Sequence, residues 1–124
     1  MILTELTRYL ATKTSLLVGK DLYRGYSPQG ATGSRVIVRD AGAAPVETDG
    51  TELIRAAVQL FMFAEEYEDR SMIDSCVDAV INQAGIELTS YTMCVTGNRA
   101  SYNGVDDQGR HLFAANLTVT MKGN

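Results

Sequence analysis

The chain has 124 residues, a length that suits one domain with a single core. Apolar residues make up 45% of the chain and charged residues 21%, which is typical of a folded protein and excludes a disordered one. The formal net charge of -4 argues against a general nucleic-acid-binding protein, and no stretch reaches the roughly 20 apolar residues that a membrane span requires. The N-terminus lacks the basic start and unbroken apolar region of a signal peptide, so we expect a protein that stays in the cytosol.

The first 40 residues predict one helix and two strands. An amphipathic stripe over residues 2–10 is typical of a helix that packs by one face. A short strand is expected around Leu22, and a second over residues 35–39, where β-branched residues lie between two arginines. Residues 27–33 are rich in glycine, proline and serine and read as a loop. The two strands are therefore expected to form a hairpin.

Residues 40–51 have no apolar period. Gly42, Pro45 and Gly50 resist regular structure, so this segment is expected to be a long exposed loop. Compact domains seldom keep a structureless loop of about a dozen residues unless it has a role, which makes the loop a candidate contact surface. A merely tolerated flexible loop is an equal alternative.

The most apolar stretch of the chain spans residues 54–64. As a strand, it places Ile54, Ala56, Val58, Leu60, Met62 and Ala64 on one face, and Ala57, Gln59, Phe61 and Phe63 on the other. Such a strand would be buried on both faces and central in its sheet. A helix also accounts for the apolar spacing, because short apolar runs fit both periods.

The second half of the chain predicts one more helix and several strands. Apolar residues recur at helical spacing over residues 68–84, at Met72, Ile73, Cys76, Val77, Val80 and Ile81, and this helix should cover one face of the central strand. Extended segments are expected at 86–96, 99–103 and 113–121, with a turn at 105–109. The predicted fold is a single α+β domain over residues 1–124, with a mainly antiparallel sheet and two helices packed on one face.

Catalytic chemistry is not expected. His111 is the only histidine, and the sequence contains no nucleophile elbow, P-loop, dinucleotide fingerprint or Cys-x-x-Cys pair. Asp106 and Asp107 precede a glycine and predict a turn rather than a cation site. Cys76 and Cys94 are expected to be reduced structural thiols. We therefore predict no catalytic residue, no cofactor and no metal, and a protein that is not an enzyme.

Charged residues near the loops are the candidates for a protein interface. Arg35 and Arg39 are four residues apart on a strand, so they should point to the same face and can pair with a partner's carboxylates. A solvated strand edge is the alternative. The residues proposed for the interface are Arg35, Arg39, Asp40, Pro45, Glu47, Asp49, Asp106, Asp107 and Arg110.

The order of these segments resembles a known family. It comprises the run Val58-Gln59-Leu60-Phe61-Met62-Phe63, the acidic-aromatic link Tyr67-Glu68-Asp69, an apolar helix, and Gly104-Val105-Asp106-Asp107-Gln108-Gly109-Arg110 before an alternating strand. This order is similar to that of the tail-terminator and minor capsid (head-tail joining) proteins of long-tailed bacteriophages, over most of the chain. The arginine that often closes the central strand in those proteins is absent here.

The resemblance implies a structural virion protein that forms a ring, usually a hexamer, on the end of the tail tube. Such a ring would stop tail polymerisation and offer a surface for head-tail joining. Its partners would be copies of itself, the tail tube protein and a head-closure or connector protein, with DNA only passing through the lumen and no membrane contact. It would be assembled in the host cytoplasm and end in the neck of the virion.

Two alternatives stay open. The first is another head-tail connector or minor capsid component. The second is a small ligand-binding or hydrolytic α+β domain with a pocket between the first helix and the sheet.

Overall fold

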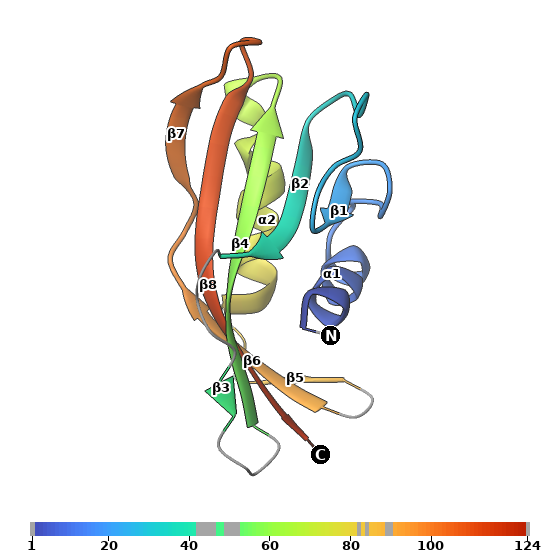
Figure 1. The fold of residues 1–124 in the computed structure, drawn as a ribbon, viewed down its shortest axis with the longest axis vertical. Helices are drawn as coiled ribbons and strands as arrows, with labels where there is room; N and C mark the ends of the chain where they lie inside the picture. Colours follow the sequence, from blue (N-terminus) through green and yellow to red (C-terminus); the bar gives the residue numbers. More distant parts are fainter. Residues whose placement is uncertain are drawn as a thin grey trace.

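A computed structural model describes residues 2–41, 47–48, 53–81, 83, 85–88 and 91–123, with the backbone alone at 47, 48 and 53. They form a small α+β domain with a curled mixed sheet and two helices (Figure 1). The elements in chain order are α1 (Ile2–Lys13), β1 (Leu22–Arg24), β2 (Arg35–Asp40), β3 (Glu47–Thr48), β4 (Leu53–Ala64), the 3-10 helix η1 (Tyr67–Arg70), α2 (Ser71–Ile81), β5 (Ile86–Glu87), β6 (Tyr91–Gly97), β7 (Ser101–Val105) and β8 (His111–Gly123).

Two long antiparallel strands, β4 and β8, form the middle of the sheet and pair from Leu53↔Lys122 to Ala64↔His111. Each is longer than the other strands beside it, so two shorter strands pair with its outer edge. β4 pairs with β2 in its second half and with β3 near its start, while β8 pairs with β7 at its start and β6 at its end. The predicted strand over residues 54–64 and its central position are therefore confirmed, and the helical alternative is excluded.

The sheet is mixed rather than mainly antiparallel, because β1 runs parallel to β2 in the register Leu22↔Val36 to Arg24↔Val38. The predicted hairpin between these strands is wrong. Residues 25–34 instead lead the chain back along the sheet, so that β2 starts beside the beginning of β1 and runs in the same direction. The connection contains turns in which Gly25, Gly30 and Gly33 adopt φ values of 83°, 87° and 81°. Glycine adopts such positive φ angles without a steric penalty.

The predicted loop over residues 40–51 also differs from the structure. Asp40 is the last residue of β2, and residues 47–48 form β3, which pairs with Ile54 and Arg55 of β4. A two-residue strand is too short to show a period in the sequence. The remainder of the predicted loop, residues 42–46 and 49–51, lies outside the described residues.

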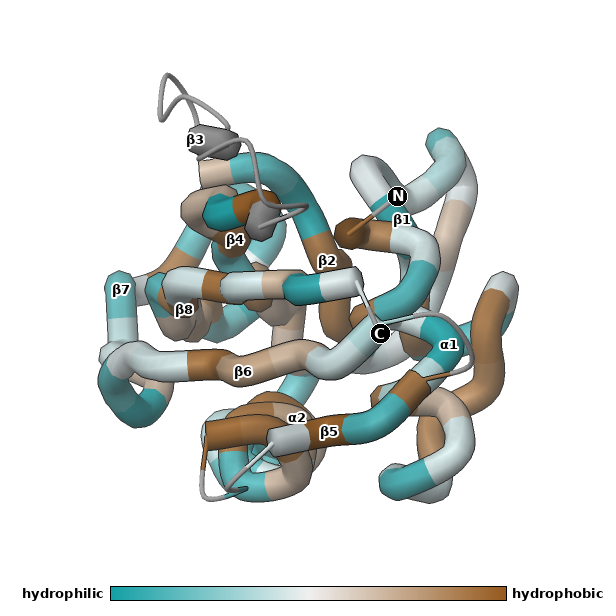
Figure 2. The backbone as a smooth tube through the Cα atoms, turned by 90° about the horizontal axis from the view of Figure 1, so that it is seen from below, coloured by the Kyte–Doolittle hydropathy of each residue, from teal (hydrophilic) through white to brown (hydrophobic). Residues whose placement is uncertain are grey.

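Alternate residues of the strands build the core. Val58, Leu60 and Met62 of β4 are fully buried, and so are Val38 and Val36, the β2 partners of Leu60 and Met62, and several residues of β8. The opposite positions of β4 are only half-buried, Phe61 and Phe63 included, so the expected burial of β4 on both faces is wrong. We call this second side of β2, β4, β6 and β8 the open face. Seen along the long axis, α2 lies to one side of the layer formed by β4, β8 and β6 (Figure 2).

Both predicted helices form, with a different start for the second. α1 buries Ile2, Leu6 and Leu10 and contacts β1, β2 and α2. The predicted helix over residues 68–84 divides into η1 and α2, and α2 buries its stripe of Ile73, Cys76, Val77 and Val80. At this start the Asp69 carboxylate accepts hydrogen bonds from the Ser34 hydroxyl at 2.5 Å and the Glu66 N–H at 3.3 Å, which ties the helix start to the loop before β2.

The two thiols are free, as predicted, and differ in environment. Cys76 is fully buried in α2, and this burial raises the pKa of its thiol to about 12. Because the thiolate is the reactive species, Cys76 is inert at neutral pH. Cys94 is exposed on β6, where it pairs with Thr120 at an open-face position.

Candidate functional site

Three arginines stack on two phenylalanine rings on the open face. The rings of Phe61 and Phe63 meet edge to face with centroids 5.1 Å apart. The guanidinium carbon of Arg39 lies 4.2 Å from the centroid of Phe61, and those of Arg35 and Arg110 lie 4.7 and 4.4 Å from the centroid of Phe63. These are cation–π distances, at which the ring attracts the positive charge. We call these five residues the arginine–phenylalanine cluster.

The strand register explains why these residues meet. Arg35 of β2 is the direct partner of Phe63 of β4, and Leu112 of β8 is the partner of Phe63 on the other side. Arg110 precedes Leu112 by two residues, so it stands on the same face of the sheet. The two arginines therefore reach Phe63 from the neighbouring strands on either side of it.

Neutral groups satisfy much of the hydrogen bonding of Arg35 and Arg39. The Nε and Nη2 atoms of Arg39 donate to Oε1 of Gln59 at 2.9 and 2.6 Å. Arg35 donates from Nε to the Ser27 hydroxyl at 3.2 Å and from Nη1 to the Gly33 carbonyl at 2.9 Å. Within the described part of the chain, neither arginine has a carboxylate at ion-pair distance.

Arg35 is an unusual cation, because only 5% of it is exposed. Its burial, followed by the positive charge of Arg110, lowers the pKa of the Arg35 guanidinium. An arginine in a protein nevertheless stays protonated. A buried charge is unfavourable without opposite charges nearby, and here the carboxylates of Glu65 and Asp106 partly offset the positive charge of Arg35.

The third arginine is held by the turn between β7 and β8. Asp106 Oδ1 accepts hydrogen bonds from the backbone N–H groups of Gln108 and Arg110, both at 2.9 Å, and Oδ2 lies 2.7 Å from Arg110 Nε. The predicted turn at 105–109 is thus confirmed, and Asp106 fixes the side chain of Arg110 over Phe63. The backbone N–H of Arg110 is the main cause that lowers the pKa of Asp106, with help from the Arg110 side chain and Gln108.

Replacing Asp106 with asparagine should remove a pH-dependent contribution to stability. A carboxyl group whose pKa is lowered by folding stabilises the fold above its ordinary pKa of about 3.9, and this contribution is lost as the pH falls through the folded value. The variant should therefore be less stable than wild type at neutral pH and approach it in acid. Urea unfolding at both pH values measures the difference. Asp107→Asn, at the exposed neighbour, leaves the hydrogen bonds of Asp106 in place and should be as stable as wild type at neutral pH.

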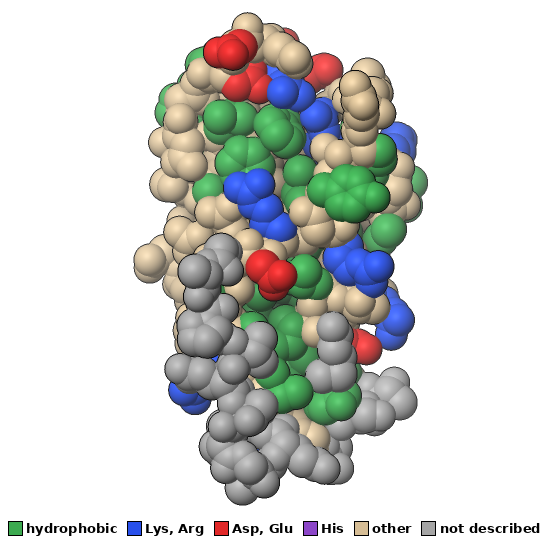
Figure 3. Space-filling model, in the orientation of Figure 1, with side chains coloured by type: hydrophobic (Ala, Val, Ile, Leu, Met, Phe, Trp, Pro, Cys, Tyr) green, Lys and Arg blue, Asp and Glu red, His purple; other side chains and the backbone are tan. Residues whose placement is uncertain are grey.

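The open face differs in charge from the rest of the protein. Its outward positions on β2, β4, β6 and β8 include Arg35, Arg39, Arg55 and Lys122, while no Asp or Glu occupies an outward position of these four strands. The rest of the sequence then holds seven Lys and Arg residues against 15 Asp and Glu residues. In Figure 3 hydrophobic and basic side chains gather over the upper half of this face, with acidic ones at its upper end and also near its middle. An acidic protein thus carries a basic, apolar face.

The structure brings some of the predicted interface residues together and separates others. Arg35, Arg39 and Arg110 meet in the cluster, and Arg35 and Arg39 share a face as their spacing predicts. Asp107 is exposed in the turn, while Asp40 stands on the opposite side of β2 from the two arginines. Glu47 is in β3, where only its backbone is described, and Pro45 and Asp49 lie outside the described residues.

Phe61, Phe63 and Gln59 were missed as site residues. The sequence places them on one face of a strand, but the apolar character of that face predicts burial. Only the register with β2 shows that arginines lie beside the rings and leave them half-exposed.

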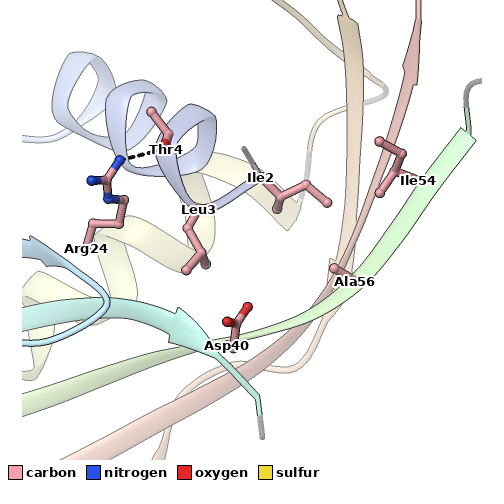
Figure 4. A pocket seen from close by; sticks show the side chains of 7 residues that line it. All are labelled: Ile2, Leu3, Thr4, Arg24, Asp40, Ile54 and Ala56. Atoms are coloured by element: carbon pink, nitrogen blue, oxygen red, sulfur yellow. Dashed lines mark hydrogen bonds between the residues drawn. The ribbon is translucent and has the colours of Figure 1, made fainter. Parts of the chain in front are cut away.

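A hollow of about 460 Å³ lies between α1 and the sheet. Its lining comprises Ile2, Leu3, Thr4, Arg24, Asp40, Ile54 and Ala56 (Figure 4). Arg24 donates a hydrogen bond to the Thr4 hydroxyl, and the side chains of Leu3 and Asp40 extend into the space from opposite sides. The hollow therefore combines apolar walls with one cation and one carboxylate.

Comparison with known proteins does not assign a family, because neither the protein-family models nor the curated proteins yield a match to this sequence. Within the described ranges, no three His, Cys, Asp or Glu side chains are grouped closely enough to hold a metal ion. No helix in the same ranges has the length and apolar character needed to cross a membrane.

Proposed function

We propose that this chain is a structural subunit of a long-tailed bacteriophage virion, one that caps the tail tube as a ring, ends tail polymerisation and presents a surface for head-tail joining. In this proposal both helices pack on the core side of the sheet, and the open face binds a protein partner of the assembly. The ring usually has six copies in the family that the sequence resembles. DNA passes through its lumen. Another head-tail connector would use the same face with different neighbours.

The observation that carries the proposal is the open face itself. Its two phenylalanine rings are partly exposed and bordered by polar groups, an arrangement that is common in protein-protein contacts. Arginine and aromatic residues are enriched in such contacts and often supply most of the binding energy. The arginine–phenylalanine cluster holds three arginines in fixed positions over aromatic rings, so a partner meets an ordered surface at a low cost in side-chain entropy.

The chemistry of the face favours a protein partner over DNA. Affinity for nucleic acid depends on several cations that neutralise phosphates. Here Arg110 is already paired with Asp106, and much of the donor capacity of Arg35 and Arg39 is taken by neutral groups. In the rest of the chain acidic residues outnumber basic ones, and this negative charge further disfavours binding to DNA. It suits a subunit past which DNA must slide.

Electron microscopy of the purified protein tests the ring. We expect closed rings of uniform diameter. Compact monomers at every concentration would contradict the proposal.

The hollow beside α1 supports a second candidate, a small ligand-binding domain. Apolar walls with a few polar groups are typical of small-molecule sites, and Arg24 and Asp40 are the polar groups here. The two candidates differ in their oligomeric state. A ligand-binding domain of this kind would be monomeric in the micrographs. Replacing Asp40 with asparagine would weaken the binding of its ligand and would leave the assembly of phage tails unchanged.

A further inference from the structure

The large hydrophobic side chains that are exposed in the described part of the chain fall into two groups. Leu17, Val18 and Tyr26 stand in the segments directly before and after β1. Tyr67, Tyr102 and Val105 stand in η1 and β7, where the rings of Tyr67 and Tyr102 lie 5.2 Å apart. We call the first group the β1 edge and the second the β7 edge.

The two edges are on opposite sides of the molecule. β1 pairs with β2 at one end of the sheet, and β7 pairs with β8 beyond β4. Figure 1 accordingly shows β7 and β1 on opposite sides, with β8, β4 and β2 between them. A surface at one edge is therefore out of reach of the other edge of the same copy.

The charges around the two edges are complementary. Lys13, Lys20 and Arg24 are exposed near the β1 edge, and the Asp21 carboxylate beside them accepts a hydrogen bond from the Leu17 N–H at 2.6 Å. Near the β7 edge the exposed charged residues include Glu65, Glu66, Glu68 and Asp107. Complementary charges orient two surfaces and speed their association, and like charges oppose other pairings.

From this arrangement we infer that the β1 edge of one copy binds the β7 edge of the next copy, in a head-to-tail contact. Apolar side chains at both edges leave water, and basic residues meet acidic ones. A contact between two different surfaces leaves one edge free at each end of the chain of subunits, so it continues until the ring closes. The inference rests on the proposed function only for that closure. The open face then remains available for the tube or the connector.

Two edge variants test the contact. Val18→Asp places a carboxylate at a position that is 61% exposed on the β1 edge, and Val105→Lys places a cation at one that is 55% exposed on the β7 edge. Each should keep a cooperative thermal transition, because neither side chain is in the core. Each variant alone should be monomeric, with a dissociation constant for self-association raised by at least about tenfold. Sedimentation velocity measures this.

Mixing the two variants distinguishes a head-to-tail contact from a symmetric one. Val18→Asp keeps an intact β7 edge, and Val105→Lys keeps an intact β1 edge. The mixture should therefore form one-to-one dimers through the intact pair of edges, and larger assemblies only where the two introduced charges, which are opposite, meet at the altered pair. As matched controls, Gln83→Asp and Gln83→Lys make similar charge changes at an exposed position just after α2 and should assemble like wild type.

Other results overturn either the inferred contact or the proposed ring. A single variant that dimerises by itself would show a symmetric contact through its intact edge. Variants that assemble like wild type would remove the edges from the contact but leave the ring intact. A wild type that stays monomeric would contradict both the contact and the ring. A wild type that forms open filaments, with one-to-one dimers from the mixed variants, would keep the contact and contradict the proposed ring.

Discussion

Leu117→Asp should prevent folding. Leu117 is 2% exposed in the middle of β8, where it pairs with Val58 of β4. An aspartate here would place an unpaired carboxylate in the core at a cost of several kcal/mol, against a total stability of about 5–15 kcal/mol for a domain. The expected result is an insoluble protein, or a soluble one without a cooperative thermal transition by circular dichroism.

The neighbouring residue is a matched control. Thr118 is exposed on the open face of the same strand, so Thr118→Asp should retain a cooperative transition within a few degrees of wild type. Equal behaviour of the two variants would mean that the core and open faces of β8 are assigned incorrectly.

Arg39→Glu should leave the fold intact and abolish the joining of heads to tails. The substitution removes the cation over Phe61 and the hydrogen bonds to Gln59, and it places a negative charge on the basic open face. An acidic partner would then be repelled. Because Arg39 is half-buried, we expect a modest loss of thermal stability and nearly complete loss of infectious particles in a complementation assay.

Arg99→Glu is the control for the change in charge. Arg99 is exposed outside the open face and pairs with Asp78 at 3.2 Å, a surface ion pair that contributes about 0–1 kcal/mol. This variant should complement like wild type. If Arg39→Glu also complements, the open face has no part in joining.

The sequence predicts those elements in which a regular apolar pattern repeats over many residues. The alternation in β4 and β8 and the apolar stripes of α1 and α2 each extend over several turns or residue pairs, so they indicate both the element and its buried side. β1 has three residues and β3 has two, and such short strands contain no information on direction or partner. For this reason the parallel pairing of β1 with β2 was not predicted.

The candidate site could be predicted only in part for a similar reason. A period of two places Arg35 and Arg39 on one face, but it does not show which residues of β4 lie beside them. The register brings Arg35 next to Phe63 and Arg39 next to Gln59, and the turn held by Asp106 adds Arg110 from a distant part of the chain. Asp40 was assigned to the same interface, although it follows Arg39 directly and therefore points to the other side of the strand.

Tail length in particles made without this chain tests the central claim most directly. A protein that caps the tube and presents a surface to the head should be needed both to stop tail growth and to join heads. Electron micrographs of an infection that lacks the chain should therefore show tails of irregular, extended length without heads, and supplying the wild-type chain should restore uniform tails with heads attached. Tails of uniform length with heads attached, in the absence of the chain, would contradict the claim.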